Sequence, residues 1–260
     1  MDWDPGQYAL FTSHRLRPAL DLLARIDHAG PRLVADLGCG NGAVLPALAR
    51  RWPDAELIGV DSSPDMLAAA AEQPARATLV EADAARWRPD RPVDVIFSNA
   101  ALHWLDHHDR LLPRLMGLLA PGGVLAIQMP DNFGQPSHTL LAEIAAEIKD
   151  GAAWRDRAAG VPRRHPVLPP ADYLAILRPV ADDIAVWQIT YHQELTGTDP
   201  VLDWTRGSCL RPVLRALQPD QRAAFTDRYA ARLRAAYPAD ADGRVVFPFQ
   251  RLFLTARRAD

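Results

Sequence analysis

The chain has 260 residues and is 48% hydrophobic, which is enough to bury a sizeable core in one domain with a small addition. A formal net charge of −3 argues against a broad nucleic-acid-binding surface. Cys39 and Cys209 are far apart and give neither a disulfide framework nor a metal-binding spacing, so we expect no metal and a reducing compartment.

The first residues, Met1-Asp2-Trp3-Asp4, include neither a basic segment nor an apolar signal core. No apolar run reaches the length of about 18 residues that a membrane-spanning helix needs. We therefore expect a cytoplasmic protein that has no membrane partner.

Residues 33–42, Leu-Val-Ala-Asp-Leu-Gly-Cys-Gly-Asn-Gly, form the most informative segment. They predict a buried strand that runs into a glycine turn, with the carboxylate of Asp36 two residues before the first glycine. Gly38, Gly40 and Gly42 carry no Cβ, so a ligand can lie against the backbone. Helical spacing follows the turn, which indicates a helix whose free N–H groups face that ligand.

Two kinds of ligand suit such a turn. A dinucleotide site prefers Gly-x-Gly-x-x-Gly, because a pyrophosphate must sit on the helix N-terminus. Here the last glycine comes one place early, and Asp36 would bring negative charge close to that phosphate. S-adenosylmethionine has no phosphate, and its ammonium is attracted by a nearby carboxylate. We therefore expect S-adenosylmethionine to contact Asp36, Gly38, Cys39 and Gly40; a plain strand-to-helix turn is the alternative.

A second strand is predicted at 55–60, and it ends at Asp61, about 20 residues after the glycines. An acid in this position can accept hydrogen bonds from both ribose hydroxyls, although it can also be a surface turn acid. The run Ser62–Met66 starts the next helix, with a serine N-cap and a proline at the first helical position. We expect Ser62 and Met66 to contact the cofactor; a methionine at helical spacing is more usually a core residue.

The pattern repeats with a third strand at 77–80. Asp83 follows it and can accept a hydrogen bond from the adenine amino group, while the N–H of Ala84 serves a ring nitrogen. A solvated turn acid is the simpler interpretation of Asp83 taken alone.

A fourth strand is predicted at 93–97, followed by residues 98–104. Open parallel sheets bind their ligands at the carboxyl ends of the strands, so this segment is expected beside the sulfonium and the incoming substrate. We assign Asn99 to the cofactor, and His103 and Trp104 to positioning the substrate. His103 alternatively fills the edge of the cleft.

The rest of the chain is predicted to be one helical segment, two further strands and a second helical block. Five strand–helix units within 31–129 favour a parallel doubly wound sheet. The expected elements are a fifth strand at 124–129 after a turn at 120–123, helices at 136–148 and 172–177, a sixth strand at 184–192, a helical block at 200–237 broken at Pro212 and Pro219, and a final antiparallel edge strand at 245–256.

These motifs together resemble those of class I methyltransferases. The matching runs are Asp-Leu-Gly-Cys-Gly-Asn-Gly at 36–42, Gly-Val-Asp-Ser-Ser-Pro-Asp-Met at 59–66, Glu-Ala-Asp at 81–83, Ser-Asn-Ala-Ala-Leu-His-Trp at 98–104 and Pro-Gly-Gly at 121–123. More narrowly, the chain resembles the trans-aconitate 2-methyltransferase family over nearly its whole length. The segments that carry this closer resemblance are 3–18, 128–133, 187–192, 202–204, 210–212 and 247–253. Two departures are Asn41, where the family often has proline, and the stretch 150–170, which does not align.

The resemblance implies an α/β fold with a Rossmann-like, mostly parallel sheet, an antiparallel last strand and an inserted helical cap. We expect residues 1–30 to form a helical segment that closes over the cofactor, with Tyr8 and Arg15 at the cofactor site. The expected sheet core comprises 31–135, 171–195 and 243–260, and the cap comprises 136–170 and 196–242.

The resemblance also implies a small polycarboxylate as substrate, esterified on one carboxylate, in a monomer or weak homodimer. Arginine suits paired carboxylate binding, so Arg211 and Arg251 are assigned to the substrate with Trp204. A carboxylate is already ionised at neutral pH, so no obligatory acid or base is expected. One alternative is a methyltransferase that acts on another acid or on a natural-product hydroxyl, with His103 as the base for the hydroxyl. The other is a non-catalytic adenosylmethionine-binding protein or a dehydrogenase-type nucleotide-binding protein.

Overall fold

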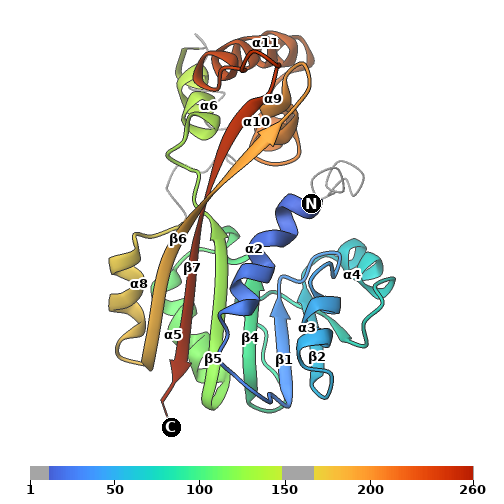
Figure 1. Cartoon of the computed structure of the whole chain (residues 1–260), viewed down its shortest axis with the longest axis vertical. Coiled ribbons are helices and arrows are strands. Elements are labelled where there is room, and N and C mark those ends of the chain that lie inside the picture. Colours follow the sequence, from blue (N-terminus) through green and yellow to red (C-terminus); the bar gives the residue numbers. More distant parts are fainter. Residues whose placement is uncertain (1–11, 148–166, 260) are drawn as a thin grey trace.

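The computed structural model describes residues 12–147 and 167–259, which are organised around a seven-stranded sheet (Figure 1). The strand order is β3-β2-β1-β4-β5-β7-β6. The first five strands pair in parallel, and β7 is antiparallel to both of its neighbours, which confirms the predicted fold class. The strands are β1 (Leu33–Leu37), β2 (Glu56–Asp61), β3 (Thr78–Glu81), β4 (Val93–Asn99), β5 (Leu119–Pro130), β6 (Ala181–Leu195) and β7 (Val245–Arg258).

Helices cover both faces of the sheet, so its central strands β1 and β4 are almost wholly buried. Every residue of β1 is buried, as expected for a parallel strand with helices on both sides. One face packs against α2 (Thr12–Ala24) and α3 (Leu45–Arg51), and the other packs against α5 (His108–Leu118) and α8 (Pro170–Leu177). The short α4 (Pro64–Ala71) lies against β2 and β3. No helix among the described residues is both long enough and apolar enough to cross a membrane.

Beyond the sheet, β6 and β7 continue as a two-stranded ribbon that carries a group of helices at its far end (Figure 1). Pairing between β5 and β7 ends at Arg251, whereas β6 and β7 stay paired as far as Leu195 and Val245. A separate hydrophobic cluster joins the ribbon end to these helices. The helices are α6 (Pro136–Glu147), α9 (Pro200–Arg206), α10 (Leu210–Ala216) and α11 (Pro219–Ala236). The division into core and cap stays a prediction, and this separate cluster supports it.

The prediction that β7 is an edge strand is wrong, because β7 lies between β5 and β6 and the edge is β6. Pro248 suggested an edge, since proline cannot donate to a neighbouring strand. Pro248 lies in the ribbon, beyond Arg251, the last residue of β7 that pairs with β5. On that side of β7 there are therefore no inter-strand hydrogen bonds for the proline to interrupt.

Two further expectations are corrected. The second helical block is interrupted at 207–209 and not at Pro212, which lies in the first turn of α10, where its missing N–H costs no helical hydrogen bond. The unit after β3 has no helix in the described chain: residues 82–92 are turns and loop, and Trp87 from this loop fills the helix layer while only 6% exposed.

The fifth strand starts earlier than predicted, at Leu119. The expected turn at 120–123 is instead a bulge within β5, since Val93 pairs with Leu119 while Val95 already pairs with Val124. Glycine and proline in this stretch interrupt the ladder without ending the strand.

Asp94 fixes the start of β1 against β4. One oxygen of this buried carboxylate accepts hydrogen bonds from the N–H groups of Arg32 (2.8 Å) and Leu33 (2.9 Å). We expect Asp94→Ala to lower the free energy of unfolding by roughly 2–4 kcal/mol, because two amides lose their acceptor. Asp94→Asn keeps an oxygen in place and is expected to lose much less. Urea unfolding of both variants is the measurement, and equal stabilities of the two would contradict this role.

Candidate active site

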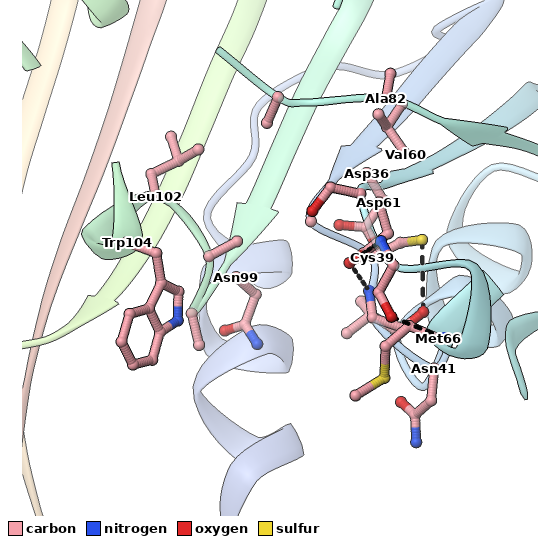
Figure 2. A pocket seen from close by; sticks show the side chains of 18 of the residues that line it. Asp36, Cys39, Asn41, Val60, Asp61, Met66, Ala82, Asn99, Leu102 and Trp104 are labelled. Carbon is pink, nitrogen blue, oxygen red and sulfur yellow. Dashed lines mark hydrogen bonds between the residues drawn. The ribbon is translucent and has the colours of Figure 1, made fainter. Parts of the chain in front are cut away.

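A cavity of about 450 Å³ lies at the carboxyl ends of β1, β2 and β4 (Figure 2). The strand order reverses between β1 and β4, and this is where open α/β sheets bind ligands. The cavity gathers most of the predicted cofactor residues and Trp104. Those it brings together are Asp36, Gly38, Cys39, Gly40, Asp61, Ser62, Met66, Asp83, Ala84, Asn99 and Trp104.

The glycine turn forms the floor of this cavity. Gly38, Gly40 and Gly42 have φ values of 74°, 54° and 72°, which side chains rarely allow. A Cβ on Gly38 would stand 2.2 Å from the Cβ of Ala101, so the turn and the segment after β4 touch through the bare backbone. The N–H groups of Gly38 and Cys39 both donate to the carbonyl of Val60, which ties the turn to β2.

Asp61 links the glycine turn to the start of α4. Its Oδ2 accepts from the N–H of Gly40 and its Oδ1 from the N–H of Ser63, both at 2.9 Å. Each carboxylate oxygen has a second lone pair, so Asp61 can still accept the predicted hydrogen bonds from the ribose hydroxyls. Ser63 caps α4 as predicted, since its Oγ accepts from the N–H of Met66 at 3.4 Å.

Asp36 is the buried acid of the cavity, and only 2% of it is exposed. Burial, and secondly the charge of Asp61, raise its pKa from 3.8 to about 7. Its Oδ2 has no hydrogen-bond partner within the described chain. Once Asp36 has lost its proton, its unpaired Oδ2 can accept a hydrogen bond from a cationic ligand group, and its charge then disfavours a pyrophosphate. Burial also raises the pKa of the neighbouring Cys39 thiol, which makes Cys39 an unreactive part of the wall.

The opposite wall comes from the segment after β4. Ala100 has a φ of 53°, an unusual value for a residue with a Cβ, and its N–H donates to the carbonyl of Gln128. Figure 2 shows Asn99 between Trp104 and the Asp36–Asp61 side of the cavity. Trp104 is 52% exposed, and so has surface available to a second ligand.

His108 holds this wall in place. One ring nitrogen donates to the carbonyl of Leu102 (2.9 Å), and the other ring nitrogen is hydrogen-bonded to the hydroxyl of Tyr173 (2.7 Å). The short helix η1 (Leu102–Trp104) is thereby tied to α8 on the far face of the sheet.

A second polar group lies next to the cavity, at the base of the ribbon. Arg251 is 4% exposed, its Nη1 donates to Gln128 Oε1 (3.2 Å), and its guanidinium lies 4.4 Å from the centre of the Phe249 ring. His103 is buried beside it. Burial, and secondly the charge of Arg251, lower the pKa of His103 from 6.5 to about 3, so this imidazole is neutral at physiological pH.

The remaining predicted site residues lie elsewhere. Trp204 is 3% exposed and packs between Phe247 and Phe249 in the cap cluster, and Arg211 is half-buried in α10. Tyr8 and the side chain of Arg15 are outside the described part of the chain. The substrate roles of Trp204, Arg211, Arg251 and His103 stay predictions.

Sequence reasoning missed part of the lining. Leu16 enters the cavity from α2, which motif spacing does not show, and Gln128 beside Arg251 carries no motif signal apart from its place at the carboxyl end of β5. The other lining residues not assigned are Asn41, Ala43, Val44, Val60, Ser63, Pro64, Asp65, Ala82, Ala100, Ala101, Leu102 and Leu105.

Comparisons with known proteins agree with this geometry. A methyltransferase domain family matches residues 34–123. The chain is 46% identical over 258 residues to trans-aconitate 2-methyltransferase of Methylobacterium radiotolerans, covering 99% of both chains. It is 48% identical over 269 residues to the protein of that name from Streptomyces coelicolor, covering 99% of this chain and 87% of that one.

Two solved structures show the same fold at low sequence identity. Phosphoethanolamine N-methyltransferase 2 of Haemonchus contortus matches with a TM-score of 0.56 and 19% identity over 94% of this chain and 53% of that one. The YcgJ protein of Bacillus subtilis matches with a TM-score of 0.57 and 15% identity over 95% and 99% of the two chains.

The sheet with its antiparallel last strand, and the glycine turn bonded to Asp61 beside the switch point, define a class I methyltransferase. The cofactor is therefore S-adenosylmethionine, and the buried Asp36 acceptor and bare glycine floor fit its ammonium and its close approach to the backbone. At 46–48% identity over nearly the whole chain, this protein belongs to the trans-aconitate 2-methyltransferase family.

Cofactor affinity is expected to depend on pH through Asp36. With a pKa of about 7, Asp36 holds a proton below neutral pH and must lose it to pair with a cation, so the Kd of S-adenosylmethionine should rise, by up to roughly tenfold per pH unit, as pH falls from 8 to 6. Asp36→Asn should bind more weakly and show little pH dependence. Calorimetry at several pH values tests this; a constant wild-type Kd would refute it.

The same group acts on stability with the opposite sign. Because the folded pKa lies above 3.8, the folded protein holds an extra proton between about pH 4 and 7. The contribution of Asp36 to the free energy of unfolding therefore falls as pH rises through that window.

Proposed function

We propose that this protein is an S-adenosylmethionine-dependent O-methyltransferase that esterifies one carboxylate of trans-aconitate or a similar small polycarboxylic acid. The observation that carries the proposal is the identity of 46–48% with proteins named trans-aconitate 2-methyltransferase over 99% of the chain. The buried guanidinium of Arg251, next to the cofactor cavity, supports a substrate that carries negative charge.

Methyl transfer to a carboxylate requires the protein mainly to bind and orient the two reactants. S-adenosylmethionine supplies an electrophilic methyl group, and a carboxylate is already ionised at neutral pH. Holding two reactants in line is worth up to ~7–11 kcal/mol of the barrier. The proposal therefore assigns binding and orientation to the chain and no obligatory acid or base.

The residues divide this work between two regions. Asp36 and Asp61 keep the negative charge on the cofactor side, where it attracts a cation and repels an acidic substrate. Arg251 lies on the other side, and His103 beside it adds polarity without charge. Trp104 lies next to Asn99 and is the exposed ring able to cover the acceptor (Figure 2).

A hydroxyl acceptor is less well supported. That reaction needs a base, and His103 was the residue considered for it. A pKa of about 3 makes this imidazole a poor proton acceptor at neutral pH. A dinucleotide is disfavoured by the buried Asp36, whose charge would face the pyrophosphate.

The setting expected from the sequence remains part of the proposal. We place the enzyme in the cytoplasm as a monomer or weak homodimer with a small-molecule partner and no nucleic-acid or membrane partner. The net charge of −3 and the absence of a cysteine framework in the sequence support this.

Product analysis tests the proposal directly. The protein is incubated with S-adenosylmethionine and a panel of mono-, di- and tricarboxylic acids and small hydroxyl compounds, and products are identified by mass spectrometry. A monomethyl ester of trans-aconitate or a related polycarboxylate is expected. Methylation of hydroxyl compounds alone would overturn the proposal.

Arg251 is expected to determine acceptor affinity. Arg251→Met should raise the KM for trans-aconitate roughly 10–100-fold, since a hydrogen bond to a charged group is worth about 1.5–3 kcal/mol. The matched control is Arg244→Met, because Arg244 is exposed and pairs with Glu194 at the far end of the ribbon. Steady-state kinetics check this, with calorimetry confirming an unchanged cofactor Kd; a wild-type KM in Arg251→Met would exclude the role.

A further inference from the structure

Asn99, Gln128 and Arg251 form a polar row across three neighbouring strands on one face of the sheet. In register, Asn99 is opposite Gln128, and Gln128 is opposite Phe253. Directly opposed residues share a face, and so do residues two apart on one strand, which adds Arg251 to the row. Phe253 packs in the same cluster as the buried face of α2, so this row lies on the α2 side of the sheet.

The row starts at the cofactor cavity and ends at the buried cation. Asn99 lines the cavity, and Arg251 lies on β7, one strand beyond Gln128. Gln128 therefore lies between Asn99 of the cofactor cavity and the buried guanidinium of Arg251.

The orientation of the Gln128 amide follows from its neighbour. A guanidinium can only donate hydrogen bonds, so the atom of Gln128 that faces Arg251 must be its oxygen, as the 3.2 Å contact has it. The amide NH₂ group then points to the other side. Gln128 is 0% exposed, and its Nε2 has no hydrogen-bond partner in the part of the chain that the structure describes.

A buried donor of this kind is unusual, because buried polar groups are nearly always paired. The Oδ1 atom of Asn99 is also buried and has no partner among the described residues, yet the two amides do not bond to each other. Asn99 lines the cavity and Gln128 lies opposite it in register, so the unpaired donor of Gln128 lies next to the cavity wall and suits a ligand that accepts a hydrogen bond.

We propose that Gln128 is a substrate-binding residue whose Nε2 donates a hydrogen bond to the carboxylate that receives the methyl group, while Arg251 holds a second carboxylate of the same acid. The inference rests on the proposed function and says which residue contacts the carboxylate that is methylated and which contacts the other carboxylate. A neutral donor orients the attacking carboxylate without neutralising it, whereas a guanidinium there would draw away the electron density that attacks. The enzyme therefore selects acids with at least two carboxylates, one for each contact.

The test compares Gln128→Met with Arg251→Met on two acceptors, trans-aconitate and the monocarboxylic acid crotonate. Methionine keeps the length of glutamine but removes both the Nε2 donor and the oxygen that accepts from Arg251, and the comparison with Arg251→Met separates these two losses. We expect Gln128→Met to lower kcat for trans-aconitate at least roughly tenfold, with a change in KM of less than about threefold. Arg251→Met should instead raise KM for trans-aconitate and change the kinetics with crotonate little.

Controls separate binding from folding. Gln188→Met makes the same change on β6, where Gln188 is exposed and donates to Asp131, and wild-type kinetics are expected. Calorimetry of S-adenosylmethionine should give a wild-type Kd for Gln128→Met. If that variant does not fold, Gln128→Glu takes its place: its carboxylate can still accept from Arg251 but repels the substrate, so kcat should fall at pH 8 and partly recover towards pH 5.

Three outcomes overturn the inference. If Gln128→Met raises KM and leaves kcat unchanged, as Arg251→Met does, Gln128 only positions Arg251. If it loses thermal stability but keeps wild-type kinetics, the amide is structural. If the wild type methylates no carboxylic acid, the proposed function fails first and the inference falls with it, whereas either of the first two outcomes with an active wild type refutes the inference alone.

Discussion

One carboxylate, that of Asp61, holds the cofactor cavity in shape. Its two oxygens accept from the amides of Gly40 and Ser63, so the turn after β1 and the turn after β2 have a common anchor. The left-handed glycines need such an anchor, because a glycine chain has the most conformational freedom to lose on folding. With the turn fixed, Gly38 can touch Ala101 and close the cavity against the segment after β4.

Charge is distributed so that the two reactants approach from opposite sides. The acids Asp36, Asp61 and Asp83 all line the cofactor cavity, and the buried cation, Arg251, lies outside it at the base of the ribbon. Under the proposed function, a cationic cofactor and an anionic acceptor would each be attracted to a different region, with Asn99 on the side of the cavity that faces the acceptor. Burial strengthens this separation, since charges interact more strongly away from water.

The sequence predicted many of the residues that line the cavity, because most of them lie at the end of a strand or within a few positions after it. Asp36, Asp61 and Asn99 could be assigned from strand ends alone, since parallel strands bring their carboxyl ends to one edge. The acceptor side was harder because it depends on pairing between distant segments. Arg251 contacts Gln128 because β7 pairs directly with β5. The prediction that β7 is the edge strand would have put these two residues apart. Likewise, nothing in the spacing of residues 98–104 shows that His103 is buried while the adjacent Trp104 is exposed.

The cap helices share a hydrophobic cluster of their own, which has no member in common with the two clusters that flank the sheet. Substitutions inside that cluster leave the packing beneath the nucleoside untouched. The helices at the far end of the ribbon can therefore change their packing without disturbing the clusters that support the cofactor cavity.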